Sequence, residues 1–197
     1  MGLEQPGLNP EEQAREQKEA VKSEKEIAWK KNLTHVEQIT DKLGKGIDEN
    51  IKEPVAAFLV HGFTTFGSCE GHIAEEGEEQ WGFSYPWIEV YAPEPEGWKE
   101  AEGEEKEQLD NEWKAENLEQ QSKMLDFLEE FYSGRETPFD ARLIFESIGA
   151  FGGFRVQSFG AEITEILPPE ERSEKLKLYQ KEMKDFGEFL KSKYFSQ

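Results

Sequence analysis

Two β-rich segments separated by a glycine-containing loop constrain the fold of this chain most. Residues 141 to 148 and 153 to 159 are rich in β-branched and aromatic side chains, and they flank the run Gly149, Ala150, Phe151, Gly152. Glycines allow a short loop to reverse the chain between two antiparallel strands. The segment therefore predicts a β-hairpin whose loop spans about five residues or fewer.

Other strand and helix signals surround this hairpin. Residues 63 to 69, with two threonines, and residues 87 to 91, with two aromatic side chains, predict two further strands. Helical patterns cover residues 9 to 43, 48 to 62, 106 to 132 and a last segment that opens at Pro168 and Pro169. This order predicts an α+β fold, with about four helices packed on a small mixed or antiparallel sheet of about four strands.

The last helical segment has the clearest amphipathic pattern. Five apolar side chains recur at spacings of three and four residues, namely Leu176, Tyr179, Met183, Phe186 and Leu190. Such a stripe predicts a helix that lies across the sheet. The chain has 197 residues and contains no repeat or low-complexity linker. We therefore expect a single domain over residues 9 to 197, preceded by a loose N-terminus over residues 1 to 8.

Charge is concentrated in one part of the sequence. The formal net charge is −20, and the stretch from Glu70 to Glu119 holds 17 acidic side chains but only three lysines. Such a surface repels bulk nucleic acid and anionic membranes, because both bind mainly to cationic side chains. The stretch is typical of a solvated face. Calcium binding is the alternative, but no EF-hand spacing supports it. An acidic face could also bind a basic protein partner.

Cysteine content and end composition bear on the compartment. Cys69 is the single cysteine, which excludes an intramolecular disulfide. Neither end has the apolar core of a signal peptide, and no apolar run is long enough to span a bilayer. These features predict a cytoplasmic protein.

The segment from Thr65 to His72 is the strongest candidate for a site. It carries small, polar and nucleophilic side chains, of which we assign Thr65, Ser68, Cys69, Glu70 and His72 to ligand binding. A strand fixes the geometry of the loop that follows it, so strand ends often hold binding groups. A tight turn stabilised by glycine and hydroxyl side chains is the other interpretation.

The sequence supports a catalytic or metal-binding role for this segment less well than a ligand-binding role. Cys69 and His72 could form a thiolate and its base, but the neighbouring carboxylate of Glu70 raises a thiol pKa. His61, Cys69 and His72 could bind a metal with Glu70 or His35, but the paired cysteines of structural zinc sites are absent. We therefore assign no metal site, no catalytic residue and no cofactor from the sequence.

Arg155 is the second candidate for ligand binding. It lies between aromatic residues in a predicted strand, where a guanidinium can bind a carboxylate or a phosphate. An ion pair with one of the many acidic side chains is the alternative. We expect Arg155 and the loop from Ser68 to His72 to line one cavity that binds an anionic or nucleotide-like ligand.

Two short motifs resemble a known family. Thr65, Ser68, Cys69, Gly71 and Ile73 are similar to the Ser-Ser-Cys-Ser-Gly-Arg-Ile segment of the methyltransferase family that acts in wybutosine synthesis on transfer RNA. A later element of that family, Gly-Phe-Arg-x-Ser-Gly, is similar to the run Gly153, Phe154, Arg155, with Ser158 and Gly160 beyond it. The resemblance implies S-adenosylmethionine as cofactor and a modified guanosine as substrate.

The two motifs also depart from that family. Here His72 replaces the family's arginine and Glu70 its second serine. The region from residue 47 to His72 also resembles an uncharacterised bacterial family of small proteins. Three functions thus stay open: a small-ligand binding module, a methyltransferase-like enzyme acting on RNA, and an acidic protein-interaction module.

Overall fold

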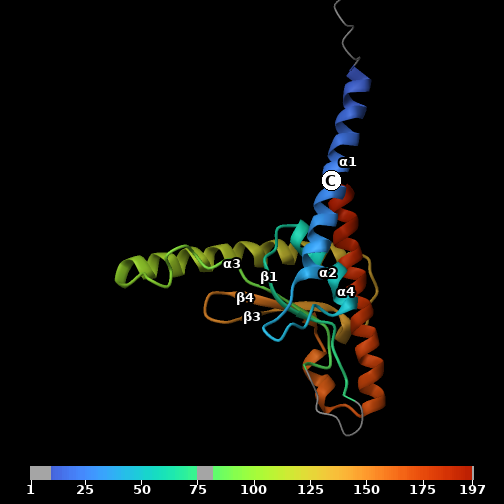
Figure 1. Cartoon of the computed structure of the whole chain (residues 1–197). Coiled ribbons are helices and arrows are strands. Elements are labelled where there is room, and N and C mark those ends of the chain that lie inside the picture. Colours follow the sequence, from blue (N-terminus) through green and yellow to red (C-terminus); the bar gives the residue numbers. More distant parts are fainter. Residues whose placement is uncertain (1–9, 75–81, 197) are drawn as a thin grey trace, which may run out of the picture.

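A computed structural model describes residues 10–74 and 82–196 of the chain, and the expected loose N-terminus lies outside these residues. The main elements are α1 (Pro10–Gln38), α2 (Lys52–Val60), β1 (Thr65–Cys69), β2 (Trp87–Val90), α3 (Gly103–Tyr132), β3 (Leu143–Ile148), β4 (Gly153–Ser158) and α4 (Pro169–Ser196). Short 3₁₀ helices lie at Glu49–Ile51, Phe139–Ala141 and Ala161–Ile166. The predicted α+β fold is confirmed (Figure 1).

The four strands form one sheet in the order β1-β2-β4-β3, and each neighbouring pair is antiparallel. The predicted hairpin is confirmed, because β3 and β4 pair from Leu143 opposite Ser158 to Ile148 opposite Gly153. Its loop contains Gly149 and Gly152, which both have a positive φ. Glycine adopts this conformation at little cost, which explains why the chain can reverse there.

One face of the sheet forms the main core. Alternate side chains of a strand point to the same face, and on this face Ile88, Val90, Phe154 and Val156 are fully buried. They share a hydrophobic cluster with side chains of α2, α3 and α4. Helices α2 and α4 run side by side, and α3 passes over the β3–β4 hairpin (Figure 1).

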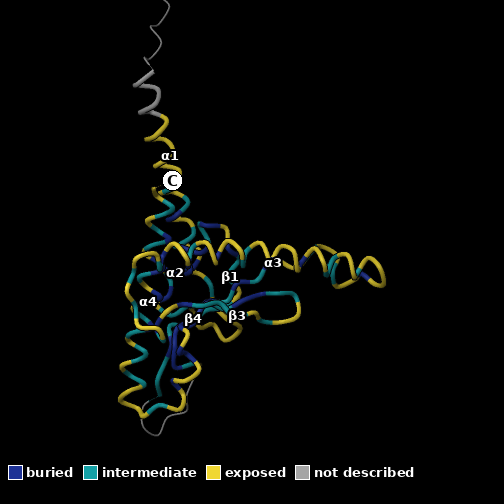
Figure 2. Tube along the Cα trace, turned by 180° about the vertical axis from the view of Figure 1, so that it is seen from behind, coloured by how far each residue is buried: buried dark blue, intermediate teal, exposed yellow. Residues whose placement is uncertain are grey.

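Helix α4 packs as its stripe predicts. Tyr179, Met183, Phe186 and Leu190 are all buried, whereas the outer parts of α1 and α3 are mostly exposed (Figure 2). The two long helices α1 and α4 meet near the C-terminus, where Trp29 of α1 contacts the ring of Phe195. Within the described residues, no helix is both long and apolar enough to cross a membrane.

The first helix ends earlier than the sequence predicts. α1 stops at Gln38, and the chain then forms a loop closed by a bridge between Thr40 and Gly46. The Asp41 side chain accepts hydrogen bonds from the backbone N–H groups of Leu43 and Lys45. Aspartate in this arrangement favours a turn over a helix, which corrects the expected end at residue 43.

Asp140 links the 3₁₀ helix at Phe139–Ala141 to α4. Its carboxylate should make the stability of the fold depend on pH. Burial alone would raise its pKa, but hydrogen bonds from Lys175 and Tyr179 lower that pKa below the ordinary value. A lowered carboxyl pKa stabilises the fold above the unfolded pKa, and this contribution is lost as pH falls through the folded pKa. Asp140→Asn should therefore be less stable than the unmodified chain near pH 7.

The difference in the free energy of unfolding between Asp140→Asn and the unmodified chain should shrink towards about pH 2, which is below the pKa of Asp140 in both the folded and the unfolded state. Urea denaturation at several pH values measures it. Asp126→Asn is the matched control, because Asp126 lies on the exposed side of α3. A difference that stays constant with pH would show that Asp140 acts through its shape and not through its charge.

Candidate functional site

A cavity of about 520 Å³ lies along the outer edge of β1. We call it the edge-strand cavity. Its walls come from the loop after α1, from β1, from Val55 of α2 and from the residues His72, Gly82 and Trp87. The lining residues are Ile39, Thr40, Asp41, Leu43, Lys45, Gly46, Ile47, Asp48, Val55, Thr65, Phe66, Gly67, Ser68, Cys69, His72, Gly82 and Trp87. This volume is within the range of small-ligand pockets.

The local sequence explains why a cavity forms here. β1 is an outer strand, and its pairing with β2 is irregular between Thr65 and Gly67. The ring of Trp87 lies so close to Gly67 that a Cβ at this position would be 3.2 Å from it. The absence of a side chain at Gly67 thus lets the indole lie close to the strand.

Four of the residues predicted from the sequence line this cavity: Thr65, Ser68, Cys69 and His72. Glu70 lies between them in sequence but borders a different, smaller cavity of about 240 Å³ beside Gln180. Its carboxylate accepts the backbone N–H of Asn50, and its carbonyl accepts the side-chain amide of Gln180. Glu70 therefore connects the loop to its surroundings and does not line the edge-strand cavity.

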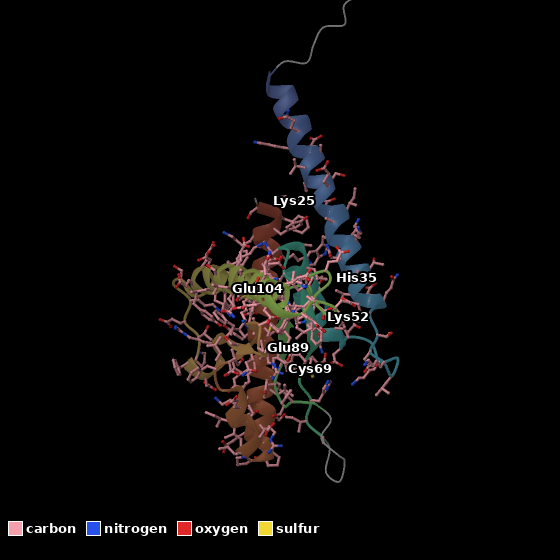
Figure 3. All side chains as sticks on the ribbon, turned by 90° about the vertical axis from the view of Figure 1, so that its left-hand side faces the viewer. Lys25, His35, Lys52, Cys69, Glu89 and Glu104 are labelled. Carbon is pink, nitrogen blue, oxygen red and sulfur yellow. The ribbon has the colours of Figure 1, made fainter. Side chains whose placement is uncertain are left out.

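Arg155 does not line this cavity either, so the prediction that it shares a cavity with the Ser68–His72 loop is wrong. Its guanidinium pairs with Glu89, which lies directly opposite on β2. The same guanidinium lies 4.7 Å from the centre of the Trp87 ring and 5.0 Å from that of Phe83. Alternation along β4 places Arg155 on the face away from the main core, where Glu89 neutralises it. Figure 3 labels Glu89 of β2 and Cys69 of the neighbouring strand β1.

Asp48 joins the site, although the sequence pattern indicates only a helix start for it. Its Oδ2 atom lies 3.0 Å from Nε2 of His72 and accepts the backbone N–H of Glu70 at 3.2 Å. One ligand-type atom from each of Asp48, Cys69 and His72 lies within 4.8 Å of the other two. Helix α2 separates Asp48 from Cys69 along the chain, so local spacing carries no signal for this meeting.

The electrostatics of this cluster argue against a reactive cysteine. Burial raises the pKa of the Cys69 thiol, and the nearby Asp48 carboxylate raises it further. Burial would also raise the pKa of Asp48, but the Glu70 N–H and the His72 ring lower it below its usual value. A nucleophilic cysteine needs a lowered pKa, so the thiol is not prepared for attack.

The other two histidines lie elsewhere. His61 ends α2, where its Nε2 contacts the backbone carbonyl of Leu190 at 2.8 Å, and burial lowers its pKa. His35 is exposed in the last turn of α1. The ligand set considered from the sequence, with His61 or His35 beside Cys69, is therefore not assembled.

Comparison of the chain with models of known families, with curated proteins and with solved structures gave no match. The resemblance to the wybutosine-synthesis methyltransferases thus stays a prediction. The function must be argued from the site itself.

Proposed function

We propose that this protein is a binding module for a small organic ligand, and that the edge-strand cavity is its site. The observation that carries the proposal is the cavity itself, which Thr65, Ser68 and His72 line together with apolar and aromatic residues. Ligand pockets combine an apolar lining with a few polar groups that fix orientation. The Thr65–His72 segment supplies those polar groups here.

The lining favours a planar ligand of nucleoside type. Trp87 and Phe66 give aromatic surface, and Ile47 and Val55 give aliphatic surface. An aromatic side chain can stack a base or a similar ring. The hydroxyl and imidazole groups can then hydrogen-bond to polar atoms at the rim of that ring.

The charges of the lining disfavour a ligand with several negative charges. Among the described lining residues, Lys45 is the only lysine or arginine, and Asp41 and Asp48 oppose it. Arg155, which the sequence suggested as the fixed positive charge, pairs with Glu89 instead. Of the anionic or nucleotide-like ligands expected from the sequence, a nucleoside or a singly charged nucleotide thus fits better than a triphosphate.

Thermal shift against a panel of nucleosides, nucleotides and S-adenosylmethionine tests this proposal. A ligand that binds only the folded state raises the midpoint temperature of unfolding. At a ligand concentration of 100 times the dissociation constant, the free energy of unfolding rises by about 2.7 kcal/mol. We expect a nucleoside-type compound to give the largest shift. A response to S-adenosylmethionine alone would favour the methyltransferase-like function, and a panel without any response would favour an acidic protein-interaction module.

Two isosteric substitutions locate the ligand. Thr65→Val and Ser68→Ala each remove one lining hydroxyl, which should weaken the bound compound by about 0.5–1.5 kcal/mol, or roughly two- to tenfold. Thr64→Val is the matched control, because Thr64 precedes Thr65 but does not line the cavity. Equal affinities in all three variants would place the ligand elsewhere.

A further inference from the structure

The turn that follows β1 has the geometry of a chelating loop. Cys69 and His72 are separated by two residues, a spacing that is typical of zinc ligands. Gly71 between them has a φ of 84°, which turns the chain so that both side chains can approach one point. Its backbone N–H donates to Sγ of Cys69 at 3.3 Å. Such a donor stabilises a thiolate, the form of cysteine that binds metals.

Asp48 completes the arrangement from another part of the chain. Its Oδ2 lies 3.0 Å from Nε2 of His72, and the ligand-type atoms of all three residues lie within 4.8 Å of one another. In a tetrahedral zinc site, bond lengths of 2.0–2.3 Å place ligand atoms about 3.3–3.6 Å apart. The observed separations are compatible with this geometry after small side-chain rotations.

We propose that Asp48, Cys69 and His72 form a Zn²⁺ site on the wall of the edge-strand cavity. All three residues line that cavity, and they are the members of this cluster among the described residues, so we assign the fourth coordination position to water or to a ligand from the cavity. A site with three protein ligands and an open position is the usual arrangement of reactive zinc, whereas structural zinc has four protein ligands. The proposal concerns the same cavity as the small-ligand proposal but does not depend on it.

The donor types select the metal. Sulfur and imidazole nitrogen suit Zn²⁺ and its spectroscopic substitute Co²⁺, whereas Ca²⁺ and Mg²⁺ require shells of oxygen ligands. When Zn²⁺ binds, the Cys69 thiol releases its proton to solvent and a Zn–S bond forms. The proton of the hydrogen bond from Nε2 of His72 to Asp48 leaves Nε2, with solvent returning a proton to Nδ1, and each of the two side chains then forms one bond to the metal. The Glu70 N–H continues to orient the Asp48 carboxylate.

The acidic surface makes the choice of readout important. A chain with a net charge of −20 attracts divalent cations without any specific site, so metal content alone proves nothing. The absorption band of a thiolate-to-Co²⁺ bond is specific, because Cys69 is the only cysteine in the sequence. The experiment is therefore a Co²⁺ titration of the full, EDTA-treated chain without any organic ligand, followed by competition with Zn²⁺.

We expect one Co²⁺ per chain with a thiolate band and tetrahedral visible bands, both abolished by stoichiometric Zn²⁺. Cys69→Ser, a nearly isosteric change, should remove the thiolate band. His72→Gln and Asp48→Asn should each weaken binding at least about tenfold, since even loss of an outer partner costs 10- to 100-fold. His35→Gln is the matched control and should bind as the unmodified chain does. The denaturation midpoint without metal shows which variants fold, and only those are compared.

Two results would overturn the proposal. One is a folded chain that gives no thiolate band at millimolar Co²⁺. The other is a band whose strength and affinity are unchanged in both His72→Gln and Asp48→Asn, which would assign the metal to the thiol alone. The small-ligand panel is repeated in EDTA, so either site can fail while the other survives.

Discussion

Phe186→Ala should lower the free energy of unfolding by about 3–5 kcal/mol, as truncation of a fully buried aromatic side chain does. Phe186 is completely buried in α4, at the centre of the core that joins the helices to the sheet. Its ring centre lies 5.1 Å from that of Phe131 and 6.0 Å from that of Phe58. The substitution thus leaves a cavity between α2, α3 and α4 that the neighbouring rings can fill only in part. Urea denaturation followed by far-UV circular dichroism measures the change.

Phe139→Ala is the control for this prediction. It removes the same atoms, but Phe139 is 68% exposed and makes its ring contact with Phe159 at the surface. Its cost should be about 1 kcal/mol or less. If both variants unfolded at the same urea concentration, α4 would not be part of the core.

Periodic patterns were sufficient to predict most of the fold. The hairpin of β3 and β4 could be predicted because glycines stand between two β-rich segments, and α4 because its apolar stripe repeats at helical spacing. The end of α1 could not be predicted in this way. The side chain of Asp41 forms a turn there, and Leu43, which fits the helical pattern, is 90% exposed.

The sequence predicted only those residues of the site that are neighbours along the chain. Thr65, Ser68, Cys69 and His72 are close in sequence and remain close in space. Asp48 reaches them because α2 packs back against β1, which is a tertiary effect that no spacing rule encodes. The prediction for Arg155 was wrong for the same kind of reason. The strand register places Glu89 opposite Arg155, and the two side chains form an ion pair within the sheet.

The acidic stretch has a simple structural account. Seven of its 17 acidic side chains lie in α3, whose outer part extends from the sheet and is mostly exposed (Figure 2). The aromatic residues of this region are shielded where they meet the hairpin, as Trp113 stacks on Phe151 at 4.4 Å. The carboxylates of α3 are thus solvated on one side of a helix whose other side packs, whereas Glu89 of the same stretch pairs with Arg155 in the sheet.

Gly71→Ala should destabilise the chain by about 2–5 kcal/mol, although it adds a single methyl group. Gly71 has a φ of 84°, a conformation that costs other residues roughly 1–2 kcal/mol. A Cβ there would also lie 2.6 Å from the backbone carbon of Tyr85 and 2.7 Å from Cδ1 of Leu176. Because a backbone atom cannot rotate away, the loop between Cys69 and His72 must shift, at a further cost of about 1–3 kcal/mol.

Gly44→Ala separates these two contributions. Gly44 has a similar φ of 78°, but a Cβ there would meet nothing within 4 Å. This control should therefore show the conformational cost alone, about 1–2 kcal/mol, and the difference between the two variants measures the clash at Gly71. The same displacement should weaken Co²⁺ binding in Gly71→Ala but not in Gly44→Ala, since only Gly71 orients Cys69 and His72. Equal denaturation midpoints for the two variants would show that the loop yields without cost, and that the approach of Gly71 to Tyr85 does not hold the site in place.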